Sequence, residues 1–133
     1  MGQPAAKQGD QVTALDTHIV MVPSAGGPVP TPQTLPFNGI IDSNLSPDVH
    51  IMSMSAAVVG STASNTPPHI PIPPGIAFQV PPLNKGTIIM GSNTVMINGK
   101  PAARNGDSAQ TCADPAPNMS AKVVAIGTVL IGG

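Results

Sequence analysis

The sequence predicts an all-β domain, and three observations lead to that prediction. The 17 prolines and 14 glycines among 133 residues end strands at short intervals and are poor helix formers. No stretch shows sustained helical periodicity, and one short motif recurs along the chain. Because the length suits one domain, we expect residues 1–133 to form a single β-repeat domain.

A motif of the form x-Pro-Ala-Ala-[Lys/Arg]-x-Gly-Asp is the unit of the repeat. It occurs at 3–10 and at 100–107, and a fainter copy at 55–61 keeps the alanine pair and the glycine. Short apolar segments at 49–51 and 95–97 precede two of the copies at the same distance. A chain that repeats one short unit buries its core by packing the copies together. We therefore expect three related units about a common axis.

The order of strands and loops follows from the β-branched runs and the prolines. Strands are expected near 18–22, 37–41, 49–54, 87–90, 94–98, 121–126 and 128–131. The Gly-Ser-Asn sequence at 91–93 favours a hairpin between the fourth and fifth of these strands. The proline-rich stretches 23–36 and 66–82 are expected to be extended loops, partly polyproline-like.

The composition argues against several classes of protein. The net charge is −1, so phosphate-driven nucleic-acid binding has little basis. No run of about 18 apolar residues predicts a transmembrane helix, and residues 1–10 lack the pattern of a signal peptide. With no Trp, no Tyr and only two Phe, the core is expected to be narrow and filled by Val, Ile, Ala and Met.

Three histidines and one cysteine are candidate metal ligands: His18, His50, His69 and Cys112. The first and third histidines each lie nine residues after the glycine of their motif copy, and the cysteine lies six after Gly106. His50 occupies the strand position that Met96 fills in the next unit. Equivalent positions of three units converge on their common axis, so the four side chains would form a closed tetrahedral site.

Other interpretations of these residues stay open. A histidine before β-branched residues is often a buried, hydrogen-bonded side chain, and a single cysteine is often a small apolar core residue. For a metal, zinc suits the donor set and iron is the competitor, because imidazole and thiolate bind both. A catalytic pair of Cys112 with a histidine has no recognisable oxyanion hole or orienting acid beside it. We therefore do not expect an enzyme.

The motif itself has a structural interpretation. The residues concerned are Pro101, Ala102, Ala103, Arg104, Gly106 and Asp107. The arginine is expected to bond the carbonyls of a turn or to pair with the aspartate of its own unit. The glycine is expected to supply a positive φ before that aspartate. The proline and the two alanines form a small, stiff step that allows backbones to approach closely.

These residues resemble a known family. Residues 101–104 spell the motif that names the PAAR-repeat proteins, and the flanking 97–100, 105–107 and 127–133 look like the same family. The resemblance covers essentially the whole chain. It implies a conical, pseudo-threefold β domain with a pointed tip and a flat triangular base. It also implies a structural metal near the tip, held by three histidines and one cysteine, which here are His18, His50, His69 and Cys112.

The resemblance implies a function as well. PAAR-repeat proteins cap the trimeric VgrG spike of the type VI secretion system and help it pierce a target membrane. Related tips occur on phage tails and on extracellular contractile injection particles. Family members often carry effectors, so effector proteins are expected partners. Such a protein would stay in the bacterial cytoplasm before firing and then leave with the spike. A second hypothesis is an adaptor that recruits cargo through its proline-rich loops.

Overall fold

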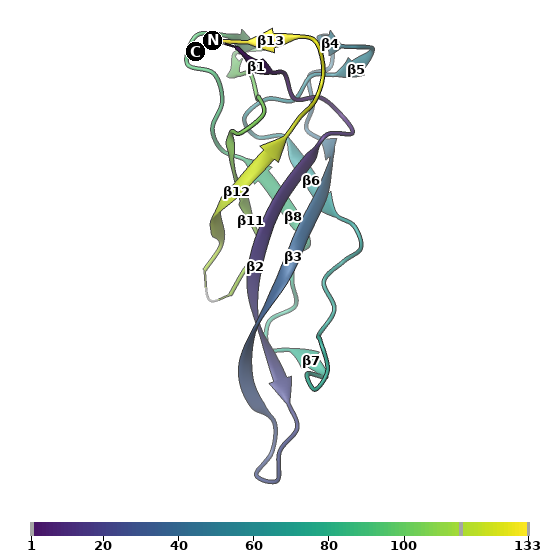
Figure 1. Cartoon of the computed structure of the whole chain (residues 1–133), viewed down its shortest axis with the longest axis vertical. Helices are drawn as coiled ribbons and strands as arrows, with labels where there is room; N and C mark the ends of the chain where they lie inside the picture. The colour runs from purple at the N-terminus through teal and green to yellow at the C-terminus, as the bar shows by residue number, and fades with distance from the viewer. Residues whose placement is uncertain (1, 115, 133) are drawn as a thin grey trace.

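The computed structural model describes residues 2–114 and 116–132, and within them the regular elements are β-strands. The all-β prediction is confirmed. Figure 1 shows a long molecule, wide where the two ends of the chain lie and narrow where β2 (Gln11–Val22) turns into β3 (Val29–Ser43). The described part of the chain contains no helix long and apolar enough to cross a membrane.

Six antiparallel strands form a closed barrel in the middle of the molecule. In order around the barrel they are β2, β3, β6 (Thr62–Asn65), β8 (Lys85–Ile88), β11 (Ser108–Thr111) and β12 (Asn118–Val124). Because β12 pairs back with β2, the sheet closes on itself. Each motif copy is followed by two of these strands, so the barrel consists of three two-stranded units.

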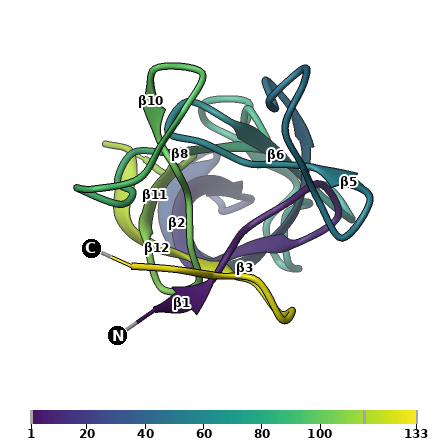
Figure 2. The same cartoon turned by 90° about the horizontal axis from the view of Figure 1, so that it is seen from above.

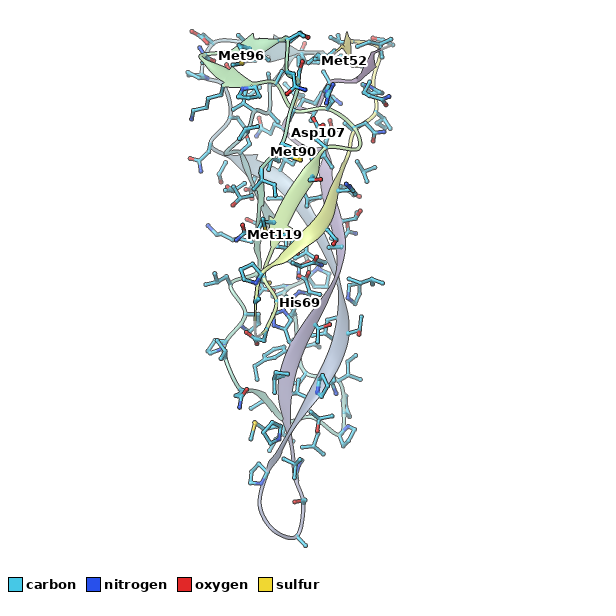
Figure 3. All side chains as sticks on the ribbon, turned by 90° about the vertical axis from the view of Figure 1, so that its left-hand side faces the viewer. Met52, His69, Met90, Met96, Asp107 and Met119 are labelled. Carbon is cyan, nitrogen blue, oxygen red and sulfur yellow. The ribbon has the colours of Figure 1, made fainter. Side chains whose placement is uncertain are left out.

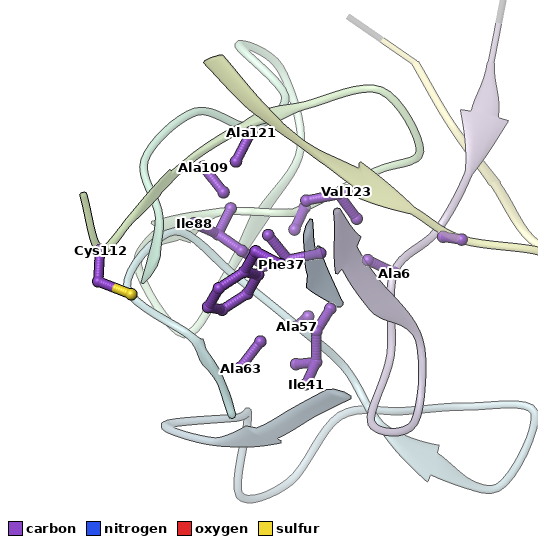
Figure 4. Close-up of a cluster of buried hydrophobic side chains, with 13 residues drawn as sticks. Ala6, Phe37, Ile41, Ala57, Ala63, Ile88, Ala109, Cys112, Ala121 and Val123 are labelled. Carbon is purple, nitrogen blue, oxygen red and sulfur yellow. The ribbon is translucent and has the colours of Figure 1, made fainter. Parts of the chain in front are cut away.

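Small side chains and one aromatic ring fill the barrel. Phe37 on β3 is 1% exposed and packs among alanine, valine and isoleucine side chains (Figure 4). Glycines make room for this ring, since a Cβ at Gly39 would lie 2.6 Å from it and one at Gly86 would lie 3.3 Å from it. The core is therefore narrow and almost free of aromatic residues.

Three short strand pairs lie at the wide end (Figure 2). They are β1 (Gln3–Pro4) with β13 (Leu130–Ile131), β4 (His50–Ile51) with β5 (Met54–Ser55), and β9 (Met96–Ile97) with β10 (Lys100–Pro101). The first pair joins the two ends of the chain. Ile51, Ile97 and Ile131 occupy equivalent places, are 7%, 8% and 7% exposed, and belong to one apolar cluster.

The second alanine of each motif copy takes part in a ring of backbone hydrogen bonds. Ala6 N–H donates to Ala103 O at 3.0 Å, Ala103 N–H to Ala57 O at 3.1 Å, and Ala57 N–H to Ala6 O at 3.0 Å. All three residues are at most 1% exposed. A methyl side chain allows the three backbones to approach this closely. The ring therefore gives the alanine pair, which even the faint middle copy keeps, a structural role.

Part of the proline-rich stretch 23–36 is a strand, so the expectation of a loop is wrong there. Within β3, Pro30 lies opposite Met21 and Pro32 opposite Ile19 in an unbroken register with β2. Prolines at every second position put their missing N–H groups on one edge of the strand, so the other edge keeps the donors that pair with β2. The β2–β3 hairpin thus continues beyond the barrel as the narrow end (Figure 1).

The hairpin expected at 91–93 is also misplaced. The tight turn lies at Asn98-Gly99, where φ is +52° and +78°, and it joins β9 to β10. β8, in contrast, pairs with β6 and β11 in the barrel. Asn-Gly is the preferred two-residue hairpin turn because both of its residues tolerate positive φ. That signal outweighs the weaker one at 91–93.

Residues 66–84 run beside the narrow end. The stretch includes β7 (Ala77–Phe78), which pairs with β2 opposite Val20 and Met21. Its seven prolines leave few backbone donors, but Ile76 N–H donates to Met21 O at 3.0 Å and Gln79 N–H to Ile19 O at 2.8 Å. These bonds attach the stretch to a strand of another repeat unit.

Candidate metal centre

Four buried side chains with metal-binding atoms meet at the narrow side of the barrel. Asp16 and His18 come from β2, His69 from the stretch between β6 and β8, and Cys112 follows β11. They are 0%, 1%, 8% and 9% exposed, and one donor atom from each lies within 4.8 Å of the others. All three repeat units contribute to the cluster. Figure 3 shows His69 at this level, far from the wide end.

The alternation of β2 directs two of these side chains inward. Val12, Asp16, His18 and Val20 are at most 1% exposed, whereas Leu15 is 69% exposed. Successive residues of a strand point to opposite faces of the sheet. The carboxylate and the imidazole, two positions apart, therefore lie side by side.

Three of the six separations between the donor atoms are close to those of a tetrahedral ligand shell, and all six lie within 4.8 Å. Cys112 Sγ lies 3.6 Å from His18 Nε2 and 3.7 Å from Asp16 Oδ2, and His69 Nε2 lies 3.4 Å from Asp16 Oδ2. Zinc bonds of about 2.0–2.1 Å to nitrogen or oxygen and about 2.3 Å to sulfur separate tetrahedral ligands by about 3.3–3.6 Å. The residues present therefore fit a zinc-sized ion.

Two side chains of the cluster, His18 and Asp16, are oriented by contacts to the atoms that point away from the cluster. His18 Nδ1 lies 3.4 Å from Asp114 Oδ2, which leaves Nε2 facing the cluster. Asp16 Oδ1 accepts from Thr111 Oγ1 at 2.5 Å and from Asn118 Nδ2 at 3.0 Å, which leaves Oδ2 facing the cluster. Such outer partners fix the orientation of ligands in metal sites.

The buried Asp16 carboxylate has no lysine or arginine partner within the described residues. It is 0% exposed, and its ion-pair partner within the described chain is His69. Burial lowers the pKa of His69, and the hydrogen bond with Asp16 opposes this shift. A buried carboxylate facing a neutral imidazole lacks the positive charge that would compensate for its desolvation. A divalent cation would supply that charge.

Burial also raises the pKa of the Cys112 thiol, and the backbone amides of Asn84 and Lys85 act in the opposite direction. The nearby Asp16 carboxylate adds to the effect of burial. A bound dication would remove the thiol proton, because a coordinating thiol is deprotonated. The two anionic ligands would then balance the charge of the ion.

Three of the four side chains that the sequence singled out are brought together. His18, His69 and Cys112 join the described cluster, whereas His50 is exposed in β4 at the wide end. The first three follow the glycine of their motif copy, but His50 precedes its copy and so lies at the opposite end of its unit. The fourth member of the cluster is Asp16, which sequence reasoning missed.

A signal for Asp16 was nevertheless present in the sequence. It lies two positions before His18, on the strand face that also carries Val12 and Val20. An acid on the apolar face of a strand needs a partner, because carboxylates are rarely buried alone.

The motif residues form the turn that leads into a barrel strand. Arg104 N–H donates to Asp107 Oδ2 at 2.7 Å, and Arg104 Nη2 pairs with Asp107 Oδ1 at 2.9 Å. Lys7 and Asp10 repeat the pair at 3.1 Å in the first copy. Gly106 has φ +88° and open space where a Cβ would lie, so the backbone conformation is what calls for glycine there.

The wide end carries exposed apolar side chains, here called the base surface. Its members belong to or adjoin the three strand pairs and are Val49, Met52, Met54, Met96, Val129 and Leu130. Met96 and Leu130, which occupy equivalent places in their units, are 60% and 61% exposed. Figure 3 shows Met52 and Met96 at this end. Apolar side chains that are exposed together at one end make that end a candidate interaction surface.

These features define a class of protein. Three related β units surround one axis, the base surface lies at one end, and a buried cluster of potential metal ligands lies towards the other. The chain belongs to the PAAR motif family, whose family model matches residues 21–113 and 79–133. That membership associates it with the spikes of contractile injection machines. No curated protein matches the chain significantly.

Proposed function

We propose that this chain is the tip of a contractile injection spike and that its base surface caps the blunt end of a trimeric VgrG-like protein. The observation that carries the proposal is the equivalence of the three strand pairs, which expose apolar side chains at Met96 and Leu130 and bury one isoleucine each. A trimer presents the same surface three times about its axis. A single chain with three similar strand pairs complements such an end and covers its exposed strand edges.

The narrow end is the part that would enter a target membrane. Residues 17–41 and 66–84, which supply most of it, contain no Asp, Glu, Lys or Arg. Charged side chains are expensive to bring into a bilayer, so an uncharged point lowers the barrier to brief passage. The contracting sheath supplies the force, and the narrow end concentrates it on a small area.

The metal of this tip is proposed to be zinc in a structural role, with iron the less favoured ion. Asp16, His18, His69 and Cys112 would hold it. Zinc would supply a rigid link among the three repeat units, since four protein ligands complete its usual coordination. We propose no catalytic activity.

The same tip would carry or link effectors and would leave the bacterial cytoplasm with the spike on firing. A phage or extracellular injection particle is the alternative machine. One observation favours an additional adaptor role: the stretch 66–84 exposes apolar side chains, with Ile70 72% and Leu83 80% exposed. Cargo proteins would bind there, away from the base.

A capture assay with the cognate trimeric spike protein tests the proposed cap. Met96→Asp and Leu130→Asp should each reduce binding by about tenfold or more, because docking would bury an unpaired charge. Met119→Asp is the matched control, since Met119 is 55% exposed on β12, outside the base surface. Figure 3 shows this methionine well away from the wide end.

The control should bind as the wild type does. If both base variants also bound the spike with unchanged affinity, the base surface would not be the docking face and the proposal would fail.

A further inference from the structure

We propose that Asn84 is a positioning residue of the metal centre and holds His69 in the arrangement that binds the ion. Asn84 belongs to none of the strands and donates no ligand atom to the cluster. It lies just before β8, at the end of the stretch 66–84 that carries His69. The inference rests on the proposed metal site.

The side chain of Asn84 fixes the backbone of His69. Asn84 Oδ1 accepts from His69 N–H at 2.7 Å. The neighbours of His69 offer little alternative support, because Pro67, Pro68 and Pro71 have no N–H group. Further along, Ile72 is tied by its N–H to the side chain of Gln33. The Asn84 bond is therefore the attachment closest to the imidazole that faces Asp16.

Asn84 is itself tied to the barrel. Its Oδ1 also accepts from Asn65 Nδ2 at 3.2 Å, and its backbone oxygen accepts from Asn65 N–H at 2.8 Å. Asn65 is 5% exposed at the end of β6, and its Oδ1 accepts from Asn38 N–H on β3 at 2.9 Å. These hydrogen bonds connect the backbone of His69, through Asn84 and Asn65, to the barrel strands β6 and β3.

Asn84 also has an uncommon backbone conformation. Its φ is +56°, in the left-handed region that asparagine tolerates better than most residues.

Substitution of Asn84 by glycine tests the effect of its side chain separately from the effect of its backbone conformation. Asn84→Gly keeps the left-handed φ and the amide but removes the oxygen that holds His69. Asn44→Gly is the matched control, because Asn44 has the same φ of +56° and lies outside the described cluster. Asn84→Asp retains an acceptor for His69 N–H and is the conservative rescue.

The test is binding of Zn²⁺ in competition with a chelator, together with the absorption spectrum of the Co²⁺-loaded protein. Asn84→Gly should weaken metal binding by about 10- to 100-fold, as loss of an outer partner does in other metal sites, and should change the Co²⁺ bands. Asn44→Gly and Asn84→Asp should match the wild type in affinity and spectrum.

Three results would overturn the inference. One is wild-type affinity and spectrum in Asn84→Gly, even if its metal-free form melts at a lower temperature, since that combination means a purely structural role. The second is a loss in Asn84→Asp equal to that in Asn84→Gly. The third is an equal loss in Asn44→Gly. A wild-type protein that binds no metal would instead refute the metal site of the proposed function.

Discussion

Asp16 gives the proposed metal centre a different charge from a site of three histidines and one cysteine. With two neutral imidazoles, one thiolate and one carboxylate, a dication would be neutralised, whereas the ligand set expected from the sequence would leave one positive charge. A net charge is costly in a buried site. The neutral set suits a centre whose ligands are all at most 9% exposed and which adjoins the uncharged narrow end.

Metal content should distinguish the two ligand sets. Cys112→Ala and Asp16→Ala should each lose most of the metal bound by the wild type, because each would remove one of the four donors. His50→Ala should keep it, because His50 is exposed in β4. Elemental analysis of the purified variants measures this directly. Loss of metal in His50→Ala with retention in Asp16→Ala would restore the ligand set expected from the sequence.

At the scale of single residues, the sequence could predict which side chains cluster only where a residue follows its motif copy along the chain. His18, His69 and Cys112 share that phase, so their convergence could be predicted from the repeat. The prediction for His50 rested only on its analogy with Met96, and both residues are exposed at the wide end. Asp16 belongs to no repeated position, so only the alternation along its strand could have indicated it.

Among the elements, the three strand pairs at the wide end act as one structure. Each contributes an isoleucine to the same apolar cluster, and the first alanine of each motif copy, Ala5, Ala56 or Ala102, is at most 2% exposed beside it. The pair formed by β1 and β13 takes its strands from opposite ends of the chain, yet buries Ile131 as deeply as the other two pairs bury theirs.

Alanine substitution should reveal this equivalence. Ile51→Ala, Ile97→Ala and Ile131→Ala should each lower the free energy of unfolding by about 2–5 kcal/mol, the usual range for deleting a buried isoleucine side chain. Leu130→Ala, at a position 61% exposed, should change it by less than about 0.5 kcal/mol. Denaturant unfolding measures all four variants. A much smaller effect of Ile131→Ala would show that the β1–β13 pair contributes little to stability.

One strand and one turn were predicted at the wrong place, and they show where local sequence patterns are ambiguous. Pro30 and Pro32 resemble a loop by composition, but their spacing of two is compatible with a strand paired on one edge. Asn98-Gly99 is a stronger hairpin signal than residues 91–93, and the turn lies there. In both cases the evidence lay in the spacing and order of residues, which composition does not record.

In the molecule as a whole, the three repeat units contact one another at two levels along the common axis. The ring of Ala6, Ala57 and Ala103 joins them near the wide end, and the ligand cluster joins them towards the narrow end. The taper arises because the units differ in length. β2 and β3 have 12 and 15 residues, whereas β6, β8 and β11 have 4 each and β12 has 7. The repeat predicts the shared axis, but not this inequality.

Removal of the metal should therefore loosen one end of the molecule more than the other. Backbone amides in 66–84 and near Cys112 should lose protection from hydrogen exchange on chelation, because the ligands that hold these segments would separate. Ala6, Ala57 and Ala103 should keep most of their protection, since their bonds do not involve the cluster.

The same treatment should lower overall stability. At a metal concentration about 1,000 times the Kd, binding stabilises the folded state by about 4 kcal/mol, and chelation removes that contribution. Hydrogen exchange followed by mass spectrometry, with a parallel thermal melt, checks both effects. Uniform loss of protection along the chain, or an unchanged melt, would contradict a local structural metal.

The pairing of β1 with β13 also governs when the fold can be completed. Gln3 and Pro4 pair with Ile131 and Leu130, more than a hundred residues later in the chain. The strand pair of the first unit therefore stays unfinished until synthesis has passed Ile131. Until then a nascent chain exposes the apolar face of β1, which makes it a natural client for chaperones.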